Sequence, residues 1–183
     1  MQAIVKAAAS MRRTHLAIGQ PMKINEGFKE ANIAHDVSAA FRKEGYYVFP
    51  EFPFSGGSID AVFIRDGEVV VCEWKRMHRR SALDITEQTA RMLRFDPRRE
   101  LADHGFQITP SVSRCLWVCD SWFDEDVEWW FGRSSPIRPP RPFDATWSLG
   151  KEDFPSLRFQ KYPDEKWTYS WLWAWCEKRL TSR

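Results

Sequence analysis

The sequence predicts a mixed α/β fold: a helix, a three-stranded antiparallel meander, a crossover helix and a parallel strand, followed by an aromatic-rich C-terminal elaboration. The 183 residues correspond to about one domain of ordinary size, and 43% of them are hydrophobic, which is enough for a core. Helical spacing and β-type alternation follow each other within residues 25–119. The dipeptide Asp66-Gly67 separates two β-branched runs, a pattern typical of a tight hairpin.

Local signals predict each element in turn. The first helix is expected from about Asn25 to Gly45, because apolar residues recur there at helical spacing. Strands are expected at residues 46–52, 59–64 and 69–75. A second helix is expected to open with a capping box at Asp84 and to end before Pro97. Residues 115–119 predict a strand parallel to the third one, since the connection contains a helix.

Changes in composition divide the chain into four parts. Residues 1–24 form an N-terminal arm, 25–132 the core, 133–143 a proline- and arginine-rich linker, and 144–183 a tryptophan-rich extension packed on the core. Within the extension, Trp167, Trp171 and Trp175 recur every four residues after Pro163, which predicts a C-terminal helix. Because aromatic stripes usually fill cores, we expect packing here and not stacking on unpaired bases.

Composition excludes several classes of protein. With 27 basic and 25 acidic residues, the net charge of +2 does not indicate a polyanionic partner. The sequence has no run of 18 apolar residues and no secretory signal, so we expect no membrane partner. Four cysteines without a C-x-x-C pair argue against zinc and indicate reduced thiols. The sequence therefore predicts a cytoplasmic protein.

The register of the central hairpin brings two acidic residues together. If Asp66 and Gly67 form a two-residue turn of the primed type, residues whose numbers add up to 133 face each other, so Asp60 lies opposite Glu73. The period of two places Lys75 on the same face as this pair, with Ser58 opposite it, whereas Ile59 lies on the other face. Both faces of the hairpin are otherwise apolar, so the two acids are predicted to be buried. A bulge or a longer turn would offset the pair.

Two buried acids need compensating charge. Lys75 supplies one positive charge against two negative ones, and buried carboxylates stay ionised only when they are paired or bound to a metal. One interpretation is a Mg²⁺ ion, with Mn²⁺ as a substitute, bound by Asp60 and Glu73 together with water and phosphate oxygens. The other is a buried network of Asp60, Lys75 and Glu73 in which one acid is protonated.

Two further polar residues lie on apolar helical stripes. On the first helix, Glu30 is in line with Val37 and Phe41, so its carboxylate either points toward the same interior or only benefits from the helix dipole. On the second helix, Gln88 is in line with Met92. Its amide either contacts the site or is a core group that needs a buried partner.

The order of Glu30, the loop at residues 55–58, Asp60 and Glu73-Trp74-Lys75 resembles the PD-(D/E)XK nuclease superfamily, whose fold is restriction-endonuclease-like. The loop is most similar to that of Holliday junction resolvases, and Gln88 is similar to a glutamine of RecB-like branches. Ile59 replaces the usual proline, a change that other members share, and the chain after Trp122 has no counterpart in the family.

The resemblance implies Mg²⁺-dependent hydrolysis of phosphodiester bonds in DNA, by an endonuclease more than an exonuclease, on branched or single-stranded substrates. It assigns Asp60, Glu73 and Glu30 as metal ligands, and Gln88 as a further site residue. Lys75 would position or deprotonate the attacking water. RNA stays open as a substrate, and a homodimer would be in keeping with resolvases.

Nucleic-acid contacts are expected beside this site. From Lys75 to Glu100, eight basic residues outnumber four acidic ones, and basic contacts to phosphate confer affinity without sequence preference. The alternative is a solvated, charged connection. The candidate contacts are Ser55, Ser58, Arg76, Arg79, Arg80 and Arg91.

A second class of function stays open, a non-catalytic binding or inhibitor protein on a nuclease scaffold. An acidic cluster within residues 120–128 would repel DNA. Together with the tryptophan-rich extension, it is a candidate surface for a protein partner; otherwise it is a solvated turn. Metal-dependent cleavage of nucleic acid distinguishes the two classes.

Overall fold

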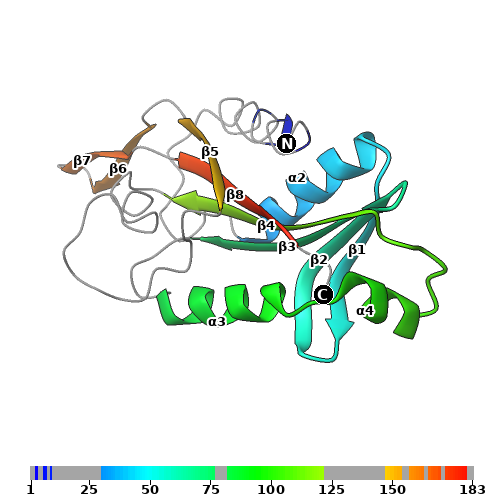
Figure 1. Cartoon of the computed structure of the whole chain (residues 1–183). Helices are drawn as coiled ribbons and strands as arrows, with labels where there is room; N and C mark the ends of the chain where they lie inside the picture. Colours follow the sequence, from blue (N-terminus) through cyan, green and yellow to red (C-terminus); the bar gives the residue numbers. More distant parts are fainter. Residues whose placement is uncertain are drawn as a thin grey trace.

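The computed structural model describes residues 30–76, 82–121, 147–153, 157–162, 165–169 and 172–180, together with positions 3, 6, 7 and 9. It has a mixed α/β architecture, as predicted (Figure 1). The elements in chain order are α2 (Glu30–Lys43), β1 (Tyr47–Phe54), β2 (Gly57–Arg65), β3 (Glu68–Arg76), α3 (Ala82–Leu93), α4 (Pro97–Asp103), β4 (Val112–Ser121), β5 (Ser148–Asp153), β6 (Leu157–Tyr162), β7 (Glu165–Tyr169) and β8 (Leu172–Arg179).

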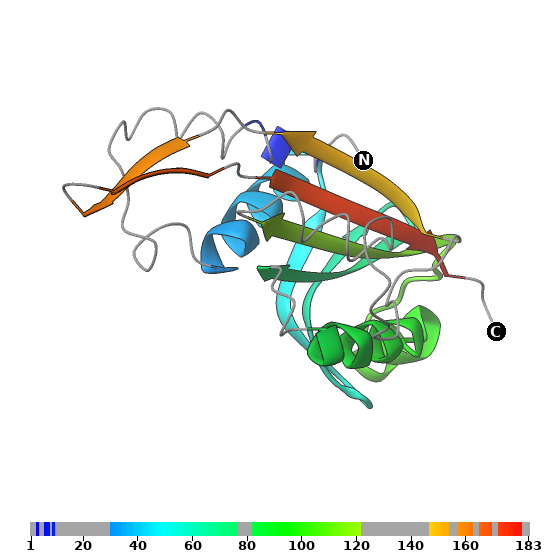
Figure 2. The same ribbon diagram turned by 90° about the vertical axis from the view of Figure 1, so that its left-hand side faces the viewer.

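Six strands form one sheet in the order β1-β2-β3-β4-β8-β5. The first three form an antiparallel meander, and β4 lies parallel to β3 as predicted. On the other side of β4, β8 and β5 extend the sheet with antiparallel pairing. A separate two-stranded ladder, β6-β7, projects beyond the main sheet in both views (Figures 1 and 2).

Helices cover the two faces of the sheet. On one face, α2 packs through Val37 and Phe41, and the rings of Phe41 and Phe63 stack with centroids 4.0 Å apart. Ala3 and Ala7 at the N-terminus are buried in the same cluster. On the opposite face, α3 and α4 pack against the sheet (Figures 1 and 2). The site described below lies on the α3 side.

The turn between β2 and β3 has the predicted geometry. Asp66 and Gly67 have φ angles of 47° and 79°, and two positive values in succession are the mark of a primed turn. The ladder pairs Arg65 with Glu68 and continues to Ala61 and Cys72, so the predicted register is confirmed over that stretch.

The prediction of a C-terminal helix is wrong. Residues Glu165–Tyr169 and Leu172–Arg179 are strands, and β8 pairs with both β4 and β5. Without β8, the edge of β4 would leave a row of backbone N–H and C=O groups unpaired, and aromatic residues are favourable in strands. Trp171, at the centre of the predicted stripe, lies outside the described residues.

Pro97 begins a helix that the sequence interpretation missed. The Asp96 side chain caps α4 by accepting hydrogen bonds from the backbone N–H groups of Arg98 and Arg99, at 3.1 and 3.3 Å. The preceding helix, α3, starts at Ala82, so the predicted capping box at residue 84 lies within its first turn.

Several predicted segments lie outside the described residues: the arm except for four positions, the linker at 133–143, and residues 122–128 of the acidic cluster. None of the helices in the described ranges has the length and apolar character needed to cross a membrane.

Candidate active site at the fork between β2 and β3

Strands β2 and β3 separate after the pair formed by Ala61 and Cys72. Both strands continue, to Gly57 in β2 and to Arg76 in β3, but the ladder between them stops. Figure 1 shows the two strands starting side by side at the turn and then diverging, as the β1-β2 hairpin bends toward α4. Asp60 is therefore the first residue of β2 at the opening of this fork.

Strand β2 also changes face at Asp60. The β1-β2 ladder skips the position where Asp60 would face Glu51, and Glu51 has a φ of 48°. Beyond this point, Ile59 packs into the same cluster as Val62, whereas Ala61 packs on the opposite face. The predicted alternation through residues 58–60 is therefore wrong; the change of face coincides with the skipped pair opposite the left-handed Glu51. Ser58 is exposed and paired with Pro53.

The fork leaves the Asp60 carboxylate free to accept a backbone hydrogen bond. The Trp74 N–H donates to Asp60 Oδ2 at 2.9 Å. In a continued ladder this N–H would bond to the carbonyl of Ile59, so the side chain replaces a strand partner. This bond fixes the carboxylate beside β3, where Glu73 precedes Trp74.

Glu73 is a buried acid beside a second acid, as predicted. Its side chain is 1% exposed. Burial raises the pKa of Glu73 to about 9, and the charge of Asp60 and a hydrogen bond with it act in the same direction, whereas Arg91 opposes the shift. The two carboxyl groups are therefore neighbours, although they meet beyond the end of the ladder and not as a regular cross-strand pair.

Arg91 on α3 supplies a positive charge that sequence reasoning did not place at this pair. Its Nη2 lies 3.3 Å from Oε1 of Glu73. The arginine also runs past Gly57, where a Cβ atom would be 3.6 Å from Arg91 Cδ. We expected Arg91 only as a phosphate contact; its spacing of three residues from Gln88 places both on one helix face and could have indicated the site.

Buried polar atoms on α3 lack partners. Gln88 Oε1 and Arg91 Nε have no hydrogen bond within the described part of the chain. Within these residues the Gln88 oxygen thus lacks the partner that a satisfied core amide would have. Buried polar atoms in native proteins are nearly always paired, so these two indicate that water or a polar ligand completes the site.

The other predicted site residues are placed in part. Lys75 lies two residues after Glu73 in β3 and shares its face by strand alternation. Glu30 is the first residue of α2 and Arg76 the last of β3, but their side chains are outside what the structure describes. Arg79 and Arg80 lie wholly outside the described residues. Their roles stay predictions.

The two carboxylates fit a hard divalent cation. Among the described residues, no three His, Cys, Asp or Glu side chains gather as a metal site. Mg²⁺ does not need such a cage, since it commonly uses one or two carboxylates and completes its octahedron with water and substrate phosphate. Gln88 Oε1, on the same face of α3 as Arg91, is an acceptor without a partner among these residues.

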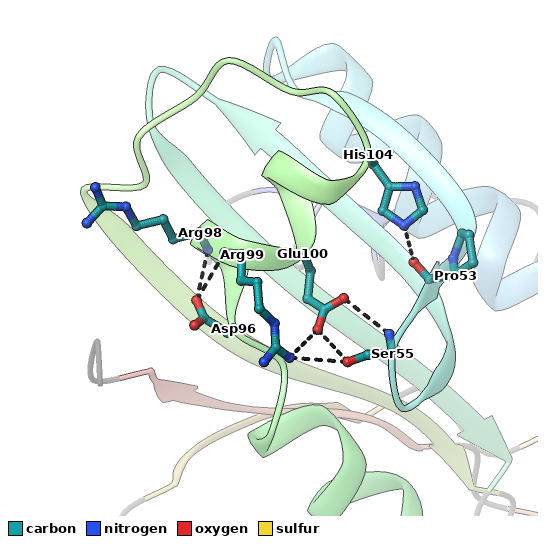
Figure 3. Close-up of polar contacts among 7 residues, drawn as sticks. All are labelled: Pro53, Ser55, Asp96, Arg98, Arg99, Glu100 and His104. Carbon is teal, nitrogen blue, oxygen red and sulfur yellow. Dashed lines mark hydrogen bonds and ion pairs between the residues drawn. The ribbon is translucent and has the colours of Figure 1, made fainter.

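A second polar cluster holds the loop that precedes Asp60 (Figure 3). The Glu100 side chain is 2% exposed and accepts hydrogen bonds from Ser55 N at 3.1 Å and Ser55 Oγ at 2.7 Å. Arg99 Nη2 lies 2.6 Å from Glu100, and His104 Nε2 is 2.8 Å from the Pro53 carbonyl oxygen. Although burial opposes ionisation, Ser55 and Arg99 together lower the pKa of Glu100.

This cluster, which we call the Glu100 clamp, joins α4 to the tip of the β1-β2 hairpin. The hydroxyl of Ser55, a predicted contact to nucleic acid, is engaged by Glu100 and Arg99. The structure thus shows Ser55 anchoring the loop from which β2 leads to Asp60.

Comparison with protein-family models, with curated proteins and with solved structures found no match.

Proposed function

We propose that the chain is a Mg²⁺-dependent nuclease that hydrolyses phosphodiester bonds in DNA, with Asp60 and Glu73 as metal ligands. The main support for this proposal is the environment of the Glu73 carboxyl group. The group is 1% exposed and adjacent to a second acid, and its pKa is about 9 even with Arg91 beside it. The pKa of Glu73 thus stays raised although Arg91 lies beside it, and a divalent ion shared by both acids would favour their ionised forms.

The order of elements supports the proposal. Helix α2, the antiparallel meander, α3 and the parallel strand β4 occur in the order that the resemblance to PD-(D/E)XK nucleases implies. The resemblance assigns Asp60, Glu73 and Lys75 to the site, and Asp60 and Glu73 are neighbours beside Trp74. We also propose that the core is restriction-endonuclease-like and that the protein is an endonuclease acting on branched or single-stranded DNA.

The side chains at the fork suit this chemistry. Bound Mg²⁺ would lower the pKa of a coordinated water and neutralise charge that develops on the phosphate. Lys75 would hold the attacking water by hydrogen bonding or accept its proton. Gln88 would accept a hydrogen bond from water through its unpartnered oxygen. Asp60, fixed by the Trp74 N–H, would keep the ligand geometry.

A cleavage assay tests the proposal. The purified protein is incubated with circular duplex, branched and single-stranded DNA and with RNA, in Mg²⁺ and in EDTA. We expect nicking of circular DNA in Mg²⁺ only, and a loss of about 10²-fold or more in Lys75→Ala. Lys43→Ala is the matched control, because Lys43 is exposed at the end of α2, on the face opposite α3.

Two results would contradict the nuclease proposal. Undiminished cleavage by Lys75→Ala would assign the activity to another residue or to a contaminant. No cleavage by the wild-type protein, together with no calorimetric Mg²⁺ binding, would favour a binding or inhibitor protein on this scaffold.

A further inference from the structure

We infer that Arg91 is an exchangeable partner of Glu73: its guanidinium contacts the Glu73 carboxyl group until Mg²⁺ binds, and then turns to a phosphate of the bound DNA. This inference rests on the proposed nuclease function. It assigns Arg91 a role in coupling metal binding to DNA binding.

The contact between Arg91 and Glu73 is made by one edge of the guanidinium. Nη2 lies 3.3 Å from Oε1, longer than the 2.7–2.9 Å typical of a charge-assisted hydrogen bond. The Arg91 side chain is 29% exposed and that of Glu73 is 1% exposed, so the arginine reaches from solvent into the fork. With Nε unpartnered, its donors are only partly used.

The fork leaves this arginine room to move. Gly57 has a φ of 125°, which favours glycine, and it places no side chain beside the guanidinium. A Cβ there would be 3.6 Å from Cδ and 3.7 Å from Nη1 of Arg91, in ordinary contact, so a longer side chain would confine the arginine. The Glu100 clamp fixes the loop, and rotation of the Arg91 side chain alone can make the exchange.

The change in charge on metal binding favours movement of Arg91 away from Glu73 and toward a phosphate. Replacing a proton on Glu73 by Mg²⁺ adds one positive charge to the site, and binding Mg²⁺ to an ionised Glu73 adds two. In both cases the nearby guanidinium opposes the metal. A DNA phosphate restores a negative partner, and its oxygens match the planar fork of arginine. Arg91 should therefore weaken metal binding to the free protein and strengthen DNA binding only when metal is present.

The test measures these two effects separately, in variants of Arg91 and in a matched control. Arg94→Gln removes the same charge from an exposed arginine just beyond α3. In calorimetric Mg²⁺ titrations without DNA, we expect Arg91→Gln to bind Mg²⁺ roughly tenfold more tightly, and Arg91→Lys and Arg94→Gln to bind as wild type. Thermal unfolding checks that each variant is folded, and Arg91→Lys retains the charge if Arg91→Gln does not fold.

The DNA arm uses fluorescence anisotropy of a labelled oligonucleotide in a Lys75→Ala background, which prevents cleavage. We expect Arg91→Gln to weaken DNA binding roughly tenfold in Mg²⁺ and to leave it unchanged in EDTA. Arg91→Lys should weaken DNA binding in Mg²⁺ as well, because lysine lacks the planar fork of donors.

Three results would overturn the inference. Equal or weaker Mg²⁺ binding by Arg91→Gln would show that Arg91 orders Glu73 for the metal. An equal loss of DNA affinity in Mg²⁺ and in EDTA would make Arg91 a simple phosphate contact. Both leave the nuclease proposal intact if the wild-type protein cleaves. If Arg91→Gln bound Mg²⁺ and the wild-type protein did not, Arg91 would block Glu73 permanently. This result would contradict both the exchange and the metal-dependent nuclease.

Discussion

Asp60 and Glu73 are neighbours with different partners. The Asp60 carboxylate is held by a backbone N–H of Trp74, which belongs to the sheet and cannot move away. Glu73 is paired with Arg91, whose side chain is 29% exposed. Protonation of the acid pair therefore concerns Glu73, whereas the backbone contact fixes the position of the Asp60 carboxylate.

The raised pKa of Glu73 makes the stability of the metal-free protein depend on pH. The unfolded chain loses this proton near pH 4.5, whereas the folded protein retains it up to about pH 9. Between these values the folded state binds more protons, so stability is full below about pH 4.5 and is lost as pH rises toward 9. The contribution of this group is about 1.4 kcal/mol per pH unit.

Urea unfolding in EDTA at several pH values between 5 and 8 tests this effect. We expect the Glu73→Gln variant to lose this part of the pH dependence and to be more stable than wild type at pH 8. Glu87→Gln, at an exposed position of α3, is the matched control and should keep the wild-type slope. An unchanged slope in Glu73→Gln would mean that Glu73 is ionised in the folded protein.

At the scale of elements, the fork forms because the β1-β2 hairpin diverges from β3 and its tip contacts α4. The β1-β2 ladder skips a pair at the left-handed Glu51, and the Glu100 clamp ties the tip of this hairpin to α4. The clamp lies on the route from α4 through Ser55 and Gly57 to Asp60. We therefore regard Glu100 as a positioning residue for the acid pair.

Removal of Glu100 should loosen the hairpin tip. Glu100→Ala would leave Ser55 and Arg99 without their buried acceptor, and we expect a loss of about 2–4 kcal/mol in unfolding free energy. Amide hydrogen exchange should speed up at residues 55–58 and stay unchanged in β4. Asp103→Ala, an exposed acid on the same helix, should behave as wild type. Unchanged exchange at 55–58 in the Glu100 variant would contradict a role for the clamp in placing the loop.

At the scale of the whole molecule, the C-terminal part completes the sheet. Strand β8 lies between β4 and β5, so it is an interior strand although it is near the end of the chain. The tryptophan-rich extension is therefore part of the fold that supports the fork, since β4 pairs with β3 on its other side.

A proline in β8 tests this pairing. Ala174 pairs with Cys119 of β4 and Lys151 of β5, so Ala174→Pro should remove a ladder hydrogen bond and destabilise the protein by about 1–3 kcal/mol, the cost of a backbone acceptor left without its partner. Ala174→Val is the matched variant. Valine is favourable in a strand, and the variant should unfold at a midpoint close to that of wild type. A neutral proline variant would contradict an interior position for β8.

Much of the core could be predicted because its signals are local. The Asp66-Gly67 turn fixed the register by its two-residue length, and the register then brought Asp60 near Glu73. Apolar periodicity located α2 and α3, and a helix in the connection indicated that β4 runs parallel to β3.

The remaining features depend on contacts between distant residues. The change of face at Asp60 lies opposite the left-handed Glu51 of another strand, and the clamp joins Ser55 to Glu100 across 45 positions. The recurrence of tryptophan every four residues is a helical pattern, but the segment pairs with the edge of β4 and forms strand β8. No local pattern in the sequence carries such information.

A metal site shared by Asp60 and Glu73 is tested most directly by a crystal structure of the protein soaked in Mn²⁺, with an anomalous difference map. We predict a peak between the carboxyl groups of Asp60 and Glu73, about 2.0–2.2 Å from one oxygen of each, with Arg91 displaced from Glu73. A map without a peak at the fork, with Arg91 still in contact with Glu73 at saturating Mn²⁺, would contradict a metal site formed by Asp60 and Glu73.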